Sequence, residues 1–162
     1  MVNTVVTFKH DGLNYWTRAA MIGALYAGLT ILLAPISYGM IQVRVAEMLM
    51  VLPYFTPAAV PGLFVGCFIA NLYGGYGLLD IIFGSLATLI SAVLVSRIKK
   101  RYFVPLPPVL INAIIVGFIL HLVLDIPFYL TAAWVGLGQL VACYGLGLPL
   151  LLILDKQRQI FM

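Results

Sequence analysis

The stretch PGLFVGCFIANLYGGYGLLDIIFGSLATL, residues 61–89, joins two apolar segments through a short polar bend. Asn71 precedes the glycine-rich centre of this bend and Asp80 follows it. Two apolar segments separated by glycines predict two helices that meet at a tight turn. Asparagine and aspartate commonly cap helix ends, and the same side chains also bind polar ligands. From this stretch alone, a structural turn and a binding site both stay open.

The composition of the chain excludes an ordinary soluble domain. Of its 162 residues, 64% are hydrophobic and 9% are charged, and the mean hydropathy is +1.12. Soluble domains have about 25% charged residues, so this chain could not solvate its own surface. We predict a single integral membrane domain over residues 1–162, without a cleaved signal peptide, because the polar start leads into a full-length apolar segment. Cys67 and Cys143 lie in apolar runs and are interpreted as packing residues.

Apolar runs and prolines divide the chain into segments that are long enough to form helices. A helix needs roughly 20 apolar residues to cross a bilayer. The region 41–73 contains Pro53, Pro57 and Pro61, which predict two short helices rather than one long helix. The predicted helices cover about residues 16–36, 42–54, 58–73, 78–99, 106–124 and 128–154.

The placement of basic residues indicates how many of these helices cross the membrane. Six crossings with an inner N-terminus leave eight of the nine Lys and Arg residues on the cytoplasmic side, with only Arg44 outside. Five crossings would place Lys9 and Arg18 outside, against the positive-inside rule. The prediction is therefore an all-α bundle of six transmembrane helices with cytoplasmic N- and C-termini. Its outer loops lie at about residues 37–42, 72–77 and 124–127.

Arg44 and Glu47 are ionisable residues in an apolar segment, where such side chains are costly unless they are paired or hydrated. They are three residues apart on one helical face, so they either pair with each other or line a polar cavity. Asp80 is either a cap at a helix N-terminus or a ligand-binding group, and Asn71 has the same two interpretations at a helix C-terminus. All four lie near the predicted outer surface, which favours a substrate-binding site there, with Tyr76 in support.

The last predicted helix contains two further candidates, Trp134 and Gln139. Trp134 offers an aromatic surface on which a planar ligand could stack. Gln139 lies so deep that it either bonds to a neighbouring helix or contacts a ligand. Asn112 is interpreted as a residue that bonds between helices, and His121 as structural rather than as a ligand.

The first predicted helix has small residues at helical spacing, namely Ala20, Ala24 and Gly28. Stripes of this kind let another helix approach closely. They predict either packing within the bundle or docking against a separate membrane subunit, and both interpretations stay open.

Motifs of common enzymes are absent from the sequence. It has no H-E-x-x-H, no G-x-S-x-G and no G-x-x-x-x-G-K-[ST]. We therefore expect no catalytic residues, no cofactor and no metal site. If the chain belongs to a pump, its ATPase must be another chain.

Three runs of sequence, PGLFVGCFIANLYGGYGLLDIIFGSLATLISA, PLPPVLINAIIVG and VGLGQLVACYGLGLPLL, resemble the QueT family of queuosine-precursor transporters. The upstream IQVRVAEMLMVLP is similar to the first-loop motif of that family, and the resemblance covers about residues 15–156. The chain departs from the pattern at Gln139, where members of the family often have glutamate.

The resemblance implies a substrate-binding S component of an energy-coupling factor (ECF) transporter, a type of ABC importer in the bacterial cell membrane. Such a protein captures a micronutrient outside the cell, here queuine or another 7-deazaguanine precursor of queuosine. A coupling transmembrane subunit and two cytosolic ATPases drive transport, and docking to them would use Ala20 and Ala24. The alternatives are an S component for a different vitamin and a stand-alone secondary transporter. We predict that the substrate is bound by Arg44, Glu47, Asn71, Tyr76, Asp80, Trp134 and Gln139.

Overall fold

The computed structural model describes residues 12–38 and 42–157, and all regular structure within these ranges is helical. The first half contains α1 (Gly12–Leu32), α2 (Ala34–Ser37), the 3-10 helix η1 (Val45–Tyr54) and α3 (Ala59–Gly74). The second half contains the π-helical η2 (Asp80–Gly84), α4 (Ser85–Arg97), η3 (Arg101–Phe103), α5 (Leu106–Leu124), α6 (Phe128–Gln139), the π-helical η4 (Leu140–Gly147) and α7 (Leu148–Lys156). η2 continues into α4, and α6, η4 and α7 form one continuous helix.

Three helices among the described residues are long and apolar enough to cross a membrane: Asp80–Arg97, Arg101–Leu124 and Phe128–Lys156. η1 and α3 are shorter apolar helices, in the region where prolines predicted two short elements. A helix occupies each of the six predicted ranges, although α1 begins earlier than predicted and ends at Leu32, where α2 follows. Six membrane crossings remain a prediction.

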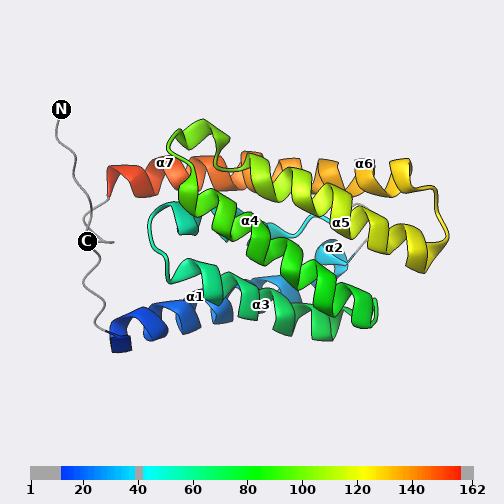
Figure 1. Ribbon diagram of the computed structural model, residues 1–162, viewed down its shortest axis with the longest axis horizontal. Helices are drawn as coiled ribbons and strands as arrows, with labels where there is room; N and C mark the ends of the chain where they lie inside the picture. Colours follow the sequence, from blue (N-terminus) through cyan, green and yellow to red (C-terminus); the bar gives the residue numbers. More distant parts are fainter. Residues whose placement is uncertain (1–11, 39–41, 158–162) are drawn as a thin grey trace.

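The helices lie alongside one another in one bundle with two distinct ends (Figure 1). The start of α1, the end of α7 and η3 lie at one end, which we call the basic end. The connections 75–79 and 125–127 lie toward the opposite end, as does α2. Exposed cations at the basic end include Arg97, Lys99, Lys100, Arg101 and Lys156. The first and last described helices thus share an end with most of the described positive charge.

The centre of the bundle is η1, which packs against α1, α3, α4, α7 and η4. Seven of its ten residues are buried, so it has almost no exposed face. Runs of 3-10 helix longer than three or four residues are uncommon and often mark a strained or functional segment. The sequence predicted a helix here, and its 3-10 geometry was not predicted. Because Glu47 lies in the first turn of η1, its side chain is carried into the middle of the bundle.

α1 and α3 approach each other so closely that their backbones touch. A Cβ atom on Gly62 would lie 2.5 Å from the carbonyl oxygen of Ala19, and one on Gly66 would lie 2.6 Å from that of Gly23. The face of α1 that packs in the bundle therefore includes Ala19, Gly23 and Ala27. This face is displaced by one residue from the predicted stripe, whose members Ala20, Ala24 and Gly28 are exposed.

Candidate ligand-binding site

Arg44 lies directly before η1 and is 3% exposed. Its Nη2 atom is 3.6 Å from Oδ2 of Asp80, and its guanidinium lies over the ring of Tyr38 at 5.6 Å from the centroid. Its Nη1 atom donates to Sγ of Cys67 at 3.9 Å. Arg44 therefore links the segment before η1 to both helices that flank the bend at residues 75–79.

Glu47 does not pair with Arg44 within the part of the chain that the structure describes. Its Oε1 atom instead accepts a hydrogen bond of 2.5 Å from the hydroxyl of Tyr26, on α1. Arg44 has an extended backbone and precedes the first helical residue, so the spacing of three does not bring the two side chains together on one helical face. Of the two interpretations of Arg44 and Glu47, direct pairing is not what the structure shows, and neither ion pair among the described residues includes Glu47.

Asn71 and Asp80 face each other across the bend. Asn71 donates from Nδ2 to the backbone oxygen of Asp80 at 2.9 Å, and both side chains are buried. α3 continues beyond Asn71 to Gly74, and Gly75 takes the left-handed conformation (φ 76°) at its C-cap, so Asn71 is not the cap. A Cβ atom on Gly84 would lie 2.8 Å from both Nδ2 of Asn71 and Oδ1 of Asp80. Glycine at this position leaves room for both polar side chains.

Cys67 lies between these groups, one helical turn before Asn71 on α3. Its sulfur accepts hydrogen bonds from Oγ1 of Thr88 at 3.2 Å and from Nδ2 of Asn71 at 3.6 Å. The sequence interpretation of Cys67 as a packing residue is therefore incomplete. A signal was present in the sequence: Cys67 is four residues before Asn71, and Thr88 is eight residues after Asp80, so each shares a helical face with a predicted site residue.

Gln139 ends α6 next to η4 and is 3% exposed. Its Oε1 atom accepts a hydrogen bond of 3.3 Å from the thiol of Cys143, which also donates to the backbone oxygen of Glu47 at 3.7 Å. The amide of Gln139 is close enough to interact with the Glu47 carboxylate. Gln139 thus joins α6 to the start of η1, on the side of the site that contains Tyr26.

We call the buried group that these contacts connect the polar cluster. Six elements or their flanking residues contribute to it, which is why no local pattern in the sequence defines it. Its members are Tyr26, Arg44, Glu47, Cys67, Asn71, Asp80, Thr88 and Gln139.

Tyrosines lie beside the polar cluster at the end opposite the basic end. The ring of Tyr38 lies against Gly74, where a Cβ atom would be 2.5 Å from Cε1, and its hydroxyl donates to the backbone oxygen of Ala70 at 2.5 Å. Tyr76 donates from its hydroxyl to the backbone oxygen of Tyr38, and the two ring centroids are 6.5 Å apart. Tyr73 lies 6.4 Å from Tyr38 in the same way. Tyr76 was predicted to support the site, whereas Tyr38, the ring that contacts Arg44, was missed.

Two residues considered in the sequence analysis, Trp134 and His121, lie apart from the polar cluster. Trp134 is half-buried on α6, and no hydrogen bond or ring contact joins it to the cluster within the described chain. His121 bonds through Nδ1 to the backbone oxygen of Ile126 at 2.6 Å, which fits the structural interpretation of this residue. No group of three or more His, Cys, Asp or Glu residues among the described positions could hold a metal ion.

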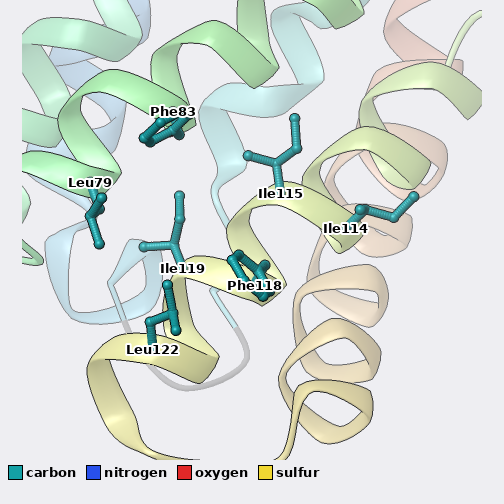
Figure 2. A pocket seen from close by; sticks show the side chains of 7 residues that line it. All are labelled: Leu79, Phe83, Ile114, Ile115, Phe118, Ile119 and Leu122. Atoms are coloured by element: carbon teal, nitrogen blue, oxygen red, sulfur yellow. The ribbon is translucent and has the colours of Figure 1, made fainter.

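An apolar pocket lies on the other side of η2, between this segment and α5 (Figure 2). Its lining contains no polar side chain, so it cannot recognise the polar edges of a base. It is lined by Leu79, Phe83, Ile114, Ile115, Phe118, Ile119 and Leu122. The polar cluster is the better candidate for a polar ligand.

The polar cluster contains several buried atoms that have no hydrogen-bond partner within the described residues. They are Nε and Nη2 of Arg44, Oε2 of Glu47, Oδ1 of Asn71 and Oδ2 of Asp80. Nε2 of Gln42, two residues before Arg44, is also buried without a partner. An unsatisfied buried polar group costs about 1–3 kcal/mol. A ligand that satisfies several of these atoms at once would recover that cost as binding energy.

The profile of a family described as QueT transporter matches residues 16–156 of the chain. The queuosine precursor transporter QueT of Lactococcus lactis subsp. cremoris (strain MG1363) is 38% identical over 90 residues, which is 52% of this chain and 53% of that protein. The matched segment thus spans about half the length of that relative. No solved structure matches the chain. The family profile extends over all members of the polar cluster and over every helix from α2 to α7, and on that basis the chain belongs to the QueT transporter family.

Proposed function

We propose that this chain is the substrate-binding S component of an ECF-type importer, which captures queuine or another 7-deazaguanine precursor of queuosine outside the cell. The family and the name of the Lactococcus lactis relative support a queuosine precursor as the substrate. The observation that carries the proposal is the polar cluster, in which several buried donor and acceptor atoms lack a hydrogen-bond partner within the described chain. In this proposal residues 1–162 form one membrane domain of six crossing helices, with the opposite end of the bundle facing outward.

The unsatisfied atoms match the hydrogen-bonding edge of a deazaguanine base. Such a base has N–H donors at N1 and at its exocyclic amino group, with a carbonyl oxygen beside them. Oδ2 of Asp80 and Oδ1 of Asn71 are acceptors for the N–H groups, as acidic side chains are for base amino groups elsewhere. Nη2 of Arg44 is a donor for the carbonyl oxygen. The ring of Tyr38, beside Arg44, is the aromatic surface on which the base stacks.

The tyrosines define the entrance in this proposal. Tyr76 lies in the connection 75–79, and its hydroxyl donates to the backbone oxygen of Tyr38, whose ring contacts Arg44 of the polar cluster. A ligand reaches the polar cluster after the segment that contains Tyr38 moves apart from the connection that contains Tyr76. Trp134, predicted as a stacking residue, contributes from α6 only after such a rearrangement.

The exposed stripe on α1 is the docking surface for the coupling transmembrane subunit. Ala20 and Ala24 are exposed, and a Cβ atom on Gly28 would meet no atom within 4 Å. Packing within the bundle uses the neighbouring face of α1, so the stripe is available to another helix. The two cytosolic ATPases that bind the coupling subunit hydrolyse the ATP.

Equilibrium titration of the purified full-length protein tests the ligand assignment. We expect queuine or the 7-aminomethyl precursor to bind with micromolar or tighter affinity, and we expect riboflavin and thiamine not to bind. Binding of riboflavin or thiamine without binding of either deazaguanine would favour an S component for another vitamin. Uptake of the precursor in cells that lack the ATPase subunits would favour a stand-alone secondary transporter.

A further inference from the structure

The polar cluster contains more acidic than basic side chains. The described side chains that are both charged and buried are Arg44, Glu47 and Asp80. When both carboxyl groups are ionised, one guanidinium against two carboxylates leaves one negative charge. Nη2 of Arg44 lies 3.6 Å from Oδ2 of Asp80, so the carboxylate that is left without an ion pair is that of Glu47.

Among the described residues, no cation lies within ion-pair distance of Glu47, and the charge of Arg44 acts on it only from further away. Glu47 is 1% exposed, and its neighbours are the hydroxyl of Tyr26 and the amide of Gln139, both of which are neutral groups. Its Oε2 atom has no hydrogen-bond partner in the described chain. The only ion pairs among the described residues are Arg44–Asp80 and the partly exposed Arg101–Asp155 near the basic end. A buried carboxylate without a cation is strongly unfavourable, so a ligand that brings a positive charge gains more here than a neutral one.

We propose that the polar cluster selects a positively charged ligand, and that Glu47 is the specificity residue that pairs with the cationic group. The inference rests on the proposed function and narrows it: among 7-deazaguanines, a base with a protonated aminomethyl substituent is preferred over a neutral base of the same size. The base edge is held by Asp80, Asn71 and Arg44, and the ammonium group donates to Oε2 of Glu47. Glu47 therefore sets which substituent is accepted, whereas the Arg44–Asp80 side sets which ring is accepted.

The test compares two ligands that differ in charge and hardly in size. Purified full-length protein is titrated with 7-aminomethyl-7-deazaguanine and with its neutral isostere 7-hydroxymethyl-7-deazaguanine. We expect the aminomethyl base to bind about tenfold or more tightly than the isostere, because a hydrogen bond to a charged group contributes more than a neutral one. This comparison needs no variant, so it does not depend on the folding of a mutant.

Two matched variants assign the preference to Glu47. Glu47→Gln keeps an oxygen that accepts from Tyr26 and removes the charge, so the ratio of the two affinities should fall to about one, mainly through weaker binding of the aminomethyl base. Asp125→Asn makes the same chemical change at an exposed acid near the opposite end, and it should leave the ratio unchanged. A thermal melt of each variant confirms that it is folded.

The outcomes separate this inference from the proposed function. Equal affinity of the unaltered protein for the two bases overturns the charge selection while leaving deazaguanine binding intact. A preference that persists in Glu47→Gln overturns the role of Glu47, and a preference lost in Asp125→Asn assigns it to surface charge instead. If neither base binds, the proposed function itself is contradicted, and this inference falls with it.

Discussion

At the scale of single residues, Arg44 is the group on which the structure of the site depends. It is almost fully buried, and it is held by Asp80 on one side, the ring of Tyr38 on another and the sulfur of Cys67 on a third. Arginine suits such a position because its planar guanidinium stacks on an aromatic ring while its N–H groups bond in the plane. Spacing in the sequence suggested Glu47 as its partner, and the contact with a residue 36 positions later could not be read from local pattern.

Replacing Asp80 should reveal how strongly this buried pair is coupled. Asp80→Asn removes the one described anion within ion-pair distance of the buried Arg44 guanidinium, and we expect the free energy of unfolding to fall by about 3 kcal/mol or more. Arg101→Gln is the control, because it breaks a pair that is 3.5 Å apart but 47% and 25% exposed, and such pairs contribute about 0–1 kcal/mol. Denaturant unfolding in detergent measures both. A similar small loss in the two variants would mean that the buried pair contributes no more than the exposed one.

At the scale of elements, the site is built where regular α-helix is interrupted. η2 begins at Asp80, η4 begins one residue after Gln139, and η1 carries Glu47 in 3-10 geometry. π-helical segments are frequent at functional sites because they redirect side chains that a regular helix would place elsewhere. Apolar runs and prolines predicted that helices would occupy these ranges. They could not predict the 3-10 and π geometry, which depends on packing between distant segments.

The same reasoning explains which site residues could be found from the sequence. Glu47, Asn71 and Asp80 stand out because they are polar residues in apolar surroundings. Tyr26 and Cys67 stand out less, because tyrosine and cysteine are ordinary residues of membrane helices and protein cores, and only the spacing of Cys67 from Asn71 connects it to a predicted site residue. Their part in the cluster is established by contacts between elements: Tyr26 of α1 bonds to Glu47 of η1, and Cys67 of α3 bonds to Arg44 and Thr88.

Gly84 tests whether the geometry of η2 matters for binding. A Cβ atom there would lie 2.8 Å from both Nδ2 of Asn71 and Oδ1 of Asp80, so Gly84→Ala should push these side chains apart. We expect the affinity for the aminomethyl base to fall about tenfold or more, in line with the loss of one hydrogen bond to a charged group. Gly145→Ala, in the other π-helical segment, adds a methyl group where no atom lies within 4 Å and should leave the affinity unchanged. Equal affinities of the two variants would show that the contact at Gly84 is not needed.

At the scale of the whole molecule, the polar cluster and the stripe on α1 lie at different places, and the proposed function gives them separate roles. The polar cluster lies inside the bundle, next to the tyrosines at the end opposite the basic end. The stripe of Ala20 and Ala24 lies on the outside of α1, whereas Tyr26, the residue of α1 that belongs to the cluster, is buried. Family membership and composition predicted a membrane transporter from the sequence. Which face of α1 remains free could not be predicted, because small residues occupy two adjacent faces and only the packing of Gly62 and Gly66 distinguishes them.

This separation predicts that docking and ligand binding can be disrupted independently. Ala20→Leu and Ala24→Leu add bulk to an exposed face without entering the bundle, so they should abolish co-purification of the coupling subunit and the ATPases while leaving ligand affinity within about twofold. Ala133→Leu makes the same change on an exposed face of α6 and should retain the complex. Co-purification from membranes, followed by titration of each variant, gives both readouts. Retention of the complex by the double α1 variant would exclude the stripe as the docking surface, and loss of ligand binding in that variant would show that the two surfaces are not independent.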